Sequence, residues 1–349
     1  MGFAFIKHDT HIDFIGWRHW AYGISIVLLL AGLASALWGN GLKMGIDFAG
    51  GVIVQVQFDK PVNDEALKKS LDIPALPGIT TQRFGEGGRD YLLRFSSAEN
   101  ADASALRTNV VNALASAFPD NAAQILRLEV VGPKVGDDLT NKALSALYYA
   151  VLLIAVYISG RFEQRWMAGA IMAAALWGGM YVLSFTGLGM GWLVLFALAI
   201  TMVVCFFLKL NFALGAVVGL LHDVFITAGL LSIMDVEIDL NVMAALLTLV
   251  GYSLNDTIIV YDRLRENLRA APKIDLASLI NRSINQTLSR TILTSGTTFV
   301  ATLSLFLLGG GVIHDFALTM LIGVFIGTAS SIYVSSAILL GLGDTDFYV

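Results

Sequence analysis

Three ionisable side chains lie inside long apolar runs of the sequence, where side chains of this kind can bind and release protons. Asp256 lies within Gly251-Tyr-Ser-Leu-Asn-Asp-Thr257, and His222 and Asp223 are neighbours in another run. An ionisable side chain in the middle of a membrane span costs about 2.5–3.5 kcal/mol on insertion scales, so such residues commonly mark proton pathways. We therefore expect proton exchange at Asp256, with His222 and Asp223 as secondary candidates. The alternatives are a fixed ion pair for Asp256, and capping of buried hydroxyls or of a helix bend by the other two.

Arg290 is the predicted partner of Asp256, because it opens a later apolar run at a similar depth. A guanidinium can hold a carboxylate with two hydrogen bonds, so the pair would act as a switch that closes when Asp256 is ionised. We expect the two side chains to touch in the deprotonated state. Asn255 is the nearest polar neighbour, but adjacent residues on a helix point about 100° apart. Hydroxyls that could hydrogen-bond across helices follow at Thr294, Ser295, Thr297 and Thr298.

The composition excludes several other kinds of chemistry. Only 14% of the 349 residues are charged, whereas a soluble domain has about 25%, and the net charge of −5 argues against a nucleic-acid binder. The single cysteine, Cys205, excludes disulfide frameworks and thiolate metal sites. The five histidines show no metal-binding spacing, and the sequence has no phosphate-binding loop. We expect no enzyme, no metal and no cofactor, with protons as the coupling ion.

Eight apolar runs approach the roughly 20 residues that cross a bilayer. The first, 21–38, follows a polar start with Lys7 and Arg18, which is the charge order of a segment whose N-terminus stays inside. A cleaved signal peptide is the alternative, since Ala34-Ser35-Ala36 resembles a cleavage site. The sequence predicts a polytopic α-helical membrane protein. The later runs lie near 143–160, 166–185, 190–208, 212–233, 240–262, 291–309 and 315–341.

Basic residues predict the orientation, because short loops that carry Lys and Arg stay on the cytoplasmic side. With the N-terminus inside, Lys142 is the single basic residue outside the block 43–140 that falls at an outer helix end. We therefore expect residues 1–20 and 342–349 to be cytoplasmic. For Arg263-Leu-Arg-Glu-Asn267 we expect a role in orientation and in balancing the helix dipole first, and in conformational coupling second. The other cytoplasmic basic residues are Lys7, Arg18, Arg161, Arg165, Lys209, Arg269, Lys273, Arg282 and Arg290.

The polar block at 39–140, after the span at 21–38, is then extracytoplasmic and has the pattern of a folded α+β domain. Apolar residues alternate along 52–58 with the period of a half-buried strand. The element order βαββαβ fits a ferredoxin-like domain, and the roughly 98 residues of the polar part, 43–140, suffice for one modest core. The expected helices are 63–71 and 101–118, and the further strands are 80–84, 91–95 and 125–131.

The remaining block, 141–341, is expected to form the transmembrane bundle. Within it the stretch 272–289 has apolar residues every fourth position opposite polar ones. This spacing predicts an amphipathic helix along the cytoplasmic membrane surface. A plain cytoplasmic linker helix is the alternative.

Several stretches together resemble the SecD/SecF family of protein-export membrane subunits, within the resistance-nodulation-division superfamily. They occur in the family's order and extend over nearly the whole chain. The stretches are Gly45-Ile-Asp-Phe-Ala-Gly-Gly51, Val131-Gly-Pro-Lys-Val-Gly136, Arg161-Phe-Glu163, His222-Asp-Val224, the run 251–267, Arg290-Thr-Ile-Leu-Thr-Ser-Gly-Thr-Thr298 and the run 321–334.

The resemblance implies a SecF-like accessory subunit of the Sec translocase in the bacterial inner membrane, which with SecD uses the proton-motive force to promote protein translocation. The translocation channel with its accessory subunits, the translocating preprotein and membrane lipids are further implied partners. In this family the residues that match Asp256 and Arg290 are linked to proton conduction, and the extracytoplasmic domain moves with the protonation state. The matching motif residues here are Gly45, Asp47, Gly50, Gly51, Arg263, Arg265, Glu266 and Asn267.

One feature departs from the family, which normally has six spans. An extra pair of spans near 166–208 separates the Arg161-Phe-Glu163 and His222-Asp-Val224 motifs. Two additional crossings preserve the orientation of everything downstream. The segments 166–170 and 212–216 are faintly alike, which is compatible with a local duplication.

Three other functions remain open on the sequence. A proton-coupled transporter or efflux subunit of the same superfamily would use the same carboxylate with a larger helix set. An intramembrane aspartyl protease needs two facing aspartates, which Asp223 and Asp256 could supply, but the Gly-x-Gly-Asp context is absent. A scaffold without proton flow would tolerate substitution of Asp256.

Overall fold

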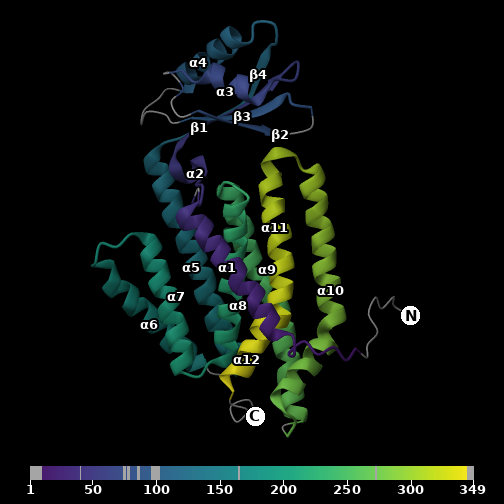
Figure 1. The fold of residues 1–349 in the computed structure, drawn as a ribbon. Helices are drawn as coiled ribbons and strands as arrows, with labels where there is room; N and C mark the ends of the chain where they lie inside the picture. The colour runs from purple at the N-terminus through teal and green to yellow at the C-terminus, as the bar shows by residue number, and fades with distance from the viewer. Residues whose placement is uncertain are drawn as a thin grey trace.

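Long helices form a bundle, and a small sheet domain sits on one end of it (Figure 1). This architecture comes from a computed structural model, which describes residues 10–39, 41–73, 76, 79–84, 87–95, 103–163, 166–271 and 273–343. We call the end of the bundle beside the sheet domain the domain end, and the opposite end the far end.

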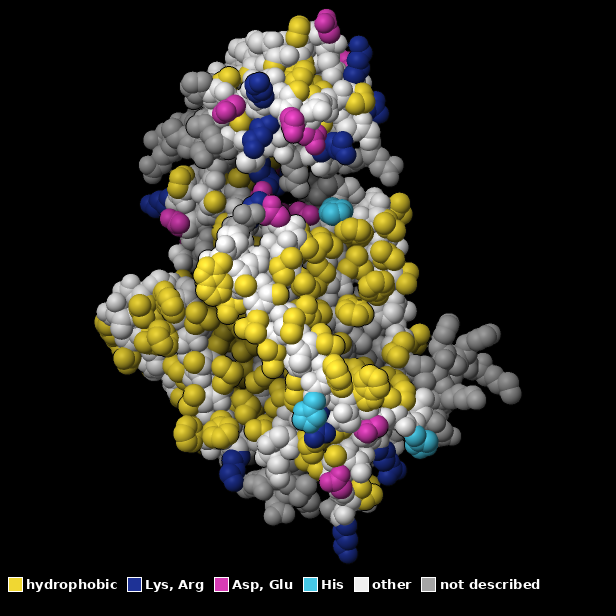
Figure 2. Space-filling model, viewed as in Figure 1, with side chains coloured by type: hydrophobic (Ala, Val, Ile, Leu, Met, Phe, Trp, Pro, Cys, Tyr) yellow, Lys and Arg dark blue, Asp and Glu magenta, His cyan; other side chains and the backbone are white. Residues whose placement is uncertain are grey.

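The described residues contain eight helices that are long and apolar enough to cross a membrane, which confirms the predicted number. Figure 2 shows hydrophobic side chains over the visible face of the bundle and charged side chains gathered on the sheet domain and toward the bundle ends. This distribution suits a chain that spans a bilayer several times. The helices are α1 (Arg18–Trp38), α5 (Pro133–Glu163), α6 (Trp166–Ser184), α7 (Met190–Phe207), α8 (Asn211–Ile233), α9 (Leu240–Ala270), α10 (Leu276–Leu308) and a last one that runs from α11 (Gly310–Ser330) through the π-helical turn η1 (Ser331–Ser335) into α12 (Ser336–Leu342).

Short polar side chains and glycine set the ends of the last three spans. Asp239 caps α9, because its carboxylate accepts a hydrogen bond from the backbone N–H of Val242 at 2.8 Å. Asp275 caps α10 in the same way, through the N–H of Ser278 at 3.2 Å. Between α10 and α11 the chain reverses at Gly310, whose φ of +71° is a conformation that glycine adopts without strain.

The stretch 272–289 differs from its prediction as a separate surface helix. From Leu276 onward it is the first half of α10, which runs unbroken for 33 residues. Its apolar stripe is buried in the main hydrophobic core with the far end of α9, instead of lying on a membrane surface. The stripe has this partner because α9 itself continues to Ala270, and Asn267 of α9 donates to Ser283 of α10 at 2.8 Å. The buried stripe residues are Leu276, Ile280, Ile284 and Leu288.

The sheet domain contains four antiparallel strands in the order β2-β3-β1-β4. Helices α3 and α4 lie on the side of the sheet that faces away from the bundle (Figure 1). Alternate residues of β1, from Val52 to Phe58, are fully buried against these helices, which is the burial that the period-two pattern predicts. The elements are α2 (Ile46–Ala49), β1 (Gly51–Phe58), α3 (Asp64–Leu71), β2 (Thr80–Phe84), β3 (Asp90–Phe95), α4 (Ala103–Ala117) and β4 (Ala123–Val131).

Hydrogen bonds and an ion pair join the sheet domain to the bundle. The segment after α1 pairs with the loop between α8 and α9, where the N–H of Gly45 donates to the carbonyl of Ile238 at 2.8 Å. Asp47 accepts from the N–H of Leu240, the first residue of α9, at 3.0 Å. Arg94 of β3 forms an ion pair with Glu237 of the same loop. The domain is therefore held at the α8–α9 loop as well as through its covalent links to α1 and α5.

Helices α6 and α7 form the extra pair, and they pack beside α5, away from α10 and α11 (Figure 1). The end of α5 and the start of α8 nevertheless adjoin, because the rings of Phe162 and Phe212 lie 5.7 Å apart. Both rings also contact Tyr261 of α9. The chain therefore leaves the bundle after α5, forms α6 and α7, and returns as α8 at a place where α5 and α8 are already in contact.

Candidate functional site

Asp256 lies on α9 with only 1% of its surface exposed. Its Oδ2 accepts a hydrogen bond from Ser295 of α10 at 3.0 Å. Its Oδ1 is buried and has no hydrogen-bond partner among the described residues. A buried carboxyl oxygen without a donor is costly to keep charged and is a place where a proton can be held.

Ser295 connects Asp256 to a third helix. Thr328 of α11 donates to the Ser295 hydroxyl at 2.8 Å. The chain of contacts Asp256–Ser295–Thr328 therefore joins α9, α10 and α11. Protonation of the carboxyl changes the acceptor that the Ser295 hydroxyl faces. The chain of hydrogen bonds can therefore transmit the protonation state of Asp256 from one helix to the next.

Arg290 does not make the expected contact with Asp256. Its guanidinium forms no ion pair with that carboxylate within 4.0 Å in this structure, and its residue surface is exposed, although the charge is near enough to act on Asp256 electrostatically. Arg290 lies five residues, or more than one helical turn, before Ser295 on α10. The hydroxyl one turn deeper is the group that reaches the carboxylate.

The other residues proposed around Asp256 play smaller parts. Asn255 is exposed and points away from the site, as its one-residue offset predicts. The hydroxyl of Thr297 donates to carbonyls of its own helix, those of Leu293 and Thr294. Among these candidates the structure thus brings Ser295 to Asp256, and leaves the others on neighbouring surfaces.

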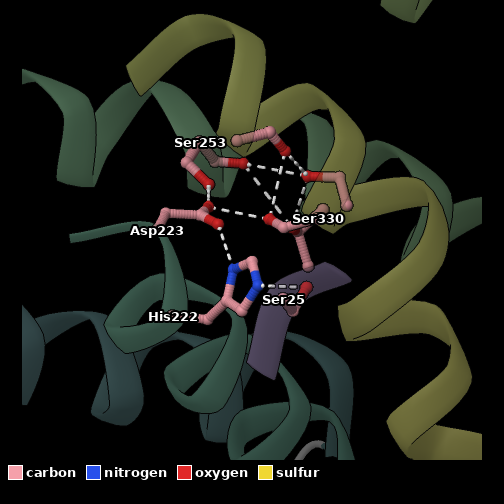
Figure 3. Close-up of polar contacts among 8 residues, drawn as sticks. Ser25, His222, Asp223, Ser253 and Ser330 are labelled. Atoms are coloured by element: carbon pink, nitrogen blue, oxygen red, sulfur yellow. Dashed lines mark hydrogen bonds and ion pairs between the residues drawn. The ribbon is translucent and has the colours of Figure 1, made fainter. Parts of the chain in front are cut away.

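His222 and Asp223 form a second buried polar cluster (Figure 3). The imidazole Nδ1 lies 2.9 Å from Oδ1 of Asp223, and Nε2 lies 2.8 Å from the hydroxyl of Ser25 on α1. Oδ2 of Asp223 accepts hydrogen bonds from Ser253 of α9 and, at 2.8 Å, from Ser330 of α11. Asp223 is completely buried. The cluster therefore joins α1, α8, α9 and α11.

Sequence reasoning missed the serines of this cluster. Ser25, Ser253 and Ser330 lie on three different helices far apart in the sequence, so no spacing rule connects them. Isolated serines in membrane helices usually hydrogen-bond to their own backbone. The one available signal was the buried charge itself, since a carboxylate in a span needs donors from neighbouring helices.

The glycine motif lies at the start of the sheet domain. Gly50 and Gly51 have φ of +73° and +136°, and a Cβ on Gly50 would lie 3.1 Å from the backbone of Pro133, the first residue of α5. Only glycine fits a turn with these angles so close to another backbone. With Gly45 and Asp47, which bind the α8–α9 loop, these residues position the domain on the bundle.

The arginine motif lies at the far end and ties α9 to its neighbours. Arg265 donates to the carbonyl of Arg161 at the end of α5 at 3.2 Å, and Arg161 pairs with Asp262 at 3.2 Å. Arg263 pairs with Glu266 one turn along α9 at 2.8 Å. These contacts fix the far ends of α5 and α9 together. Asn267 extends the same function to α10, through Ser283 and Gln286.

Charged groups also gather where the domain meets the bundle. Burial lowers the pKa of Arg94, against the opposing effect of Asp315, Asp239 and Asp47. Burial raises the pKa of Asp239, and the charges of Asp47 and Asp315 add to this. Within the described part of the chain no three His, Cys, Asp or Glu side chains are placed to hold a metal ion.

Comparisons with known proteins agree on one family. The family model described as "Protein export membrane protein SecD/SecF, C-terminal" matches residues 110–189 and 185–345, and the SecD/SecF GG motif matches residues 35–62. Proteins named "Protein translocase subunit SecF" are similar over nearly their full length. The one from Vibrio alginolyticus is 36% identical over 98% of this chain and 93% of its own, and the one from Magnetococcus marinus is 41% identical over 97% and 93%.

A solved structure supports the same conclusion. The crystal structure of SecDF from Thermus thermophilus, described as a translocon-associated membrane protein, superposes with a TM-score of 0.70 at 30% identity and covers 96% of this chain. This chain corresponds to 39% of that longer chain. The same motif positions, helices and full-length relatives thus lead to one assignment: the chain belongs to the SecD/SecF family of protein-export membrane proteins, and its full-length relatives there are SecF subunits.

Proposed function

We propose that the chain is a SecF-like accessory subunit of the Sec protein translocase that, with SecD, uses the proton-motive force to promote protein translocation across the inner membrane. Protons are the coupling ion, and the chain catalyses no covalent reaction of its own. The translocation channel and the translocating preprotein are its further partners. The names of the full-length relatives support this role.

The observation that carries the proton-coupling proposal is the surroundings of Asp256. The carboxyl is buried between helices, has one oxygen with no donor among the residues that the structure describes, and reaches two other helices through Ser295. When protonated, Asp256 gains an O–H donor, and the hydrogen bond from Ser295 is no longer required to offset a charge. Helices α9, α10 and α11 can then shift relative to one another. Arg290 lies nearby on α10 and would approach Asp256 when the carboxyl is ionised.

The driving force is large enough for a mechanical step. A proton that returns through 100 mV supplies about 2.3 kcal/mol, so a few protons could bias a rigid-body rotation of the sheet domain. The ion pair and hydrogen bonds at the α8–α9 loop give such a rotation a defined contact to break and remake.

For the orientation, we propose cytoplasmic N- and C-termini and a periplasmic sheet domain. The support is the distribution of basic residues, since Arg161, Arg263 and Arg265 gather at the far end of the bundle. For the sheet domain we propose a ferredoxin-like fold. Its element order, with two helices on one face of an antiparallel sheet, supports this.

SecD is the proposed partner because the matching SecDF chain is longer. This chain covers 39% of it, so a single polypeptide there carries further sequence joined to the SecF-like part. A separate SecD subunit would supply the equivalent part here. Copurification of the two subunits tests this directly.

The experiment is the substitution Asp256→Asn in cells that lack the native subunit, followed by export of a secreted reporter with and without a proton-motive force. We expect loss of the force-dependent part of export, because asparagine keeps the shape and the hydrogen bond from Ser295 but cannot exchange a proton. Asn255→Ala, on the exposed face of the same helix turn, is the matched control and should export normally. Unchanged export by Asp256→Asn, at normal protein level and with SecD bound, would reject proton coupling at this residue.

A further inference from the structure

The cluster around His222 and Asp223 is not used by the proposed pathway through Asp256, yet every polar atom of the pair has a partner (Figure 3). Two serine hydroxyls donate to Oδ2 of Asp223, and the imidazole faces Oδ1. These donors offset an ionised carboxylate without a lysine or arginine. The other imidazole nitrogen, Nε2, lies 2.8 Å from the hydroxyl of Ser25 on α1. Its role in this hydrogen bond, as donor or acceptor, is the one feature of the cluster that can change.

The order serine–histidine–aspartate is that of hydrolase triads, but the surroundings do not fit hydrolysis. A triad needs backbone N–H donors aimed at a developing oxyanion. Ser25 lies beyond the first turn of α1, and His222 in the middle of α8, where backbone N–H groups are used within the helix. The arrangement therefore suits binding of a proton better than attack on a substrate.

We propose that His222 and Asp223 form a second proton-binding site of the membrane region, and that the Ser25 hydroxyl transmits its state to α1. This inference deepens the proposed function and rests on it, since it assigns a second coupling site to the same proton-driven cycle. The two proposed proton-binding sites contact different helices. Asp256 reaches α10 and α11, whereas His222 reaches α1, the helix that leads into the sheet domain.

The Ser25 hydroxyl has a single proton, so its role changes with the charge of His222. With Asp223 ionised and Nδ1–H donating to it, a neutral imidazole leaves Nε2 as an acceptor, and Ser25 must donate to it. A protonated imidazole instead donates from Nε2, and Ser25 accepts. Its own O–H is then free to bond to the carbonyl of Ala21, one turn earlier. Serine bonds of this kind back to the helix backbone bend helices.

Helix α1 is placed to respond to such a bend. Gly32 is its one buried residue, so most of its surface faces away from the bundle. At Gly32 it crosses α8 so closely that a Cβ would lie 2.7 Å from the Cα of Gly229. The segment before α1 is held at α10, where Asn285 binds both backbone groups of Ile12. Ser25 lies between these two anchored points, where a change of angle would redirect the end that carries the domain.

The pair has no other charged contact within the described helices. Its hydrogen-bond partners are the three serines, and α8 carries no further charged residue. The ionisable groups of the helices packed against it lie elsewhere on those helices. They are Arg18, His19 and Tyr22 on α1, Tyr252, Asp256, Tyr261, Asp262 and Arg269 with the arginine motif on α9, His314 and Asp315 at the domain end of α11, and Tyr333 in η1.

The test measures the position of α1 as a function of pH. Spin labels are placed at Trp38→Cys and Trp192→Cys, which are 82% and 60% exposed toward the domain ends of α1 and α7, in a Cys205→Ser background. Helix α7 is the reference because it is not one of the helices that Asp256 joins. The labelled chain, with SecD in lipid nanodiscs, is compared by EPR distance measurement at about pH 5.5 and about pH 8. We expect a pH-dependent shift of the distance distribution in the otherwise unchanged protein.

Matched variants assign the shift. Asp223→Asn and Ser25→Ala should abolish it, and Ser25→Thr should restore it, because threonine keeps the hydroxyl. Asp256→Asn, His19→Asn and His314→Asn should leave it intact. SecD binding and an unchanged distance at about pH 8 show that each variant is folded. The proposal is overturned if the distance is independent of pH, if the shift survives Ser25→Ala, or if it disappears in Asp256→Asn, whereas force-dependent export by Asp256→Asn would reject only the proposed function at Asp256.

Discussion

At the scale of single residues, Asp239 has two opposing roles at the base of the sheet domain. Its carboxylate caps α9 through the N–H of Val242, which favours a negative charge at a helix N-terminus. Burial and the nearby charges of Asp47 and Asp315 disfavour that charge and raise its pKa above the ordinary 3.8. The folded protein therefore binds a proton here more readily than the unfolded chain does, and this contribution to stability is lost as pH rises through the raised pKa.

The substitution Asp239→Asn should remove the penalty and keep the cap. We expect the purified protein to melt at the same or a higher temperature at neutral pH, and to lose less stability between about pH 4 and pH 7. Asp239→Ala should be less stable than Asp239→Asn by about 1 kcal/mol, because alanine cannot cap α9. Thermal unfolding across this pH range measures both effects. A steeper loss of stability with rising pH in Asp239→Asn would contradict the burial argument.

At the scale of elements, the contact of α1 with α8 depends on the absence of side chains. Gly32 and Gly229 meet backbone to backbone, a type of crossing that small residues allow in membrane helices. One turn farther, Ser35 and Ser232 lie within hydrogen-bond distance at 2.9 Å. The crossing holds the sheet domain's leading helix at a fixed point on the bundle.

Gly32→Ala should therefore push α1 away from α8. The added methyl group meets backbone, which cannot rotate aside, so we expect a loss of about 1–3 kcal/mol, the usual range for overpacking. Gly23→Ala on the same helix is the control, because no atom lies within 4 Å of its added Cβ. Thermal unfolding in detergent compares the two variants. Equal stability would show that the crossing yields at little cost.

At the scale of the whole molecule, we predict that the pair α6–α7 is an insert in the family's bundle of helices. The contacts that tie α5 to α9, through Arg161 and Phe162, do not involve the insert.

Deletion of residues 166–208 should leave a chain that folds, because Phe162 and Phe212 already place the ends of α5 and α8 together. Removing two crossings keeps the orientation of the later helices, and lipid can cover the apolar face of α5 that becomes exposed. We expect normal membrane insertion and SecD copurification, and a decrease in melting temperature. Loss of SecD binding would instead assign the extra pair to the subunit interface.

The sequence by itself determined the elements and the buried carboxyl on which the proposed function rests. Apolar runs of bilayer length predicted eight spans, alternation predicted the strands, and the cost of a charge in lipid identified Asp256, since each of these signals is local. The tertiary structure decided what these elements touch. It joined 276–289 to α10 because α9 extends far enough to cover its apolar stripe. It placed Ser295, instead of Arg290, within hydrogen-bond distance of Asp256. It also brought three serines, Ser25, Ser253 and Ser330, around the pair His222 and Asp223. Hydrogen bonds between distant helices depend on packing depth and rotation, which no spacing along one helix records.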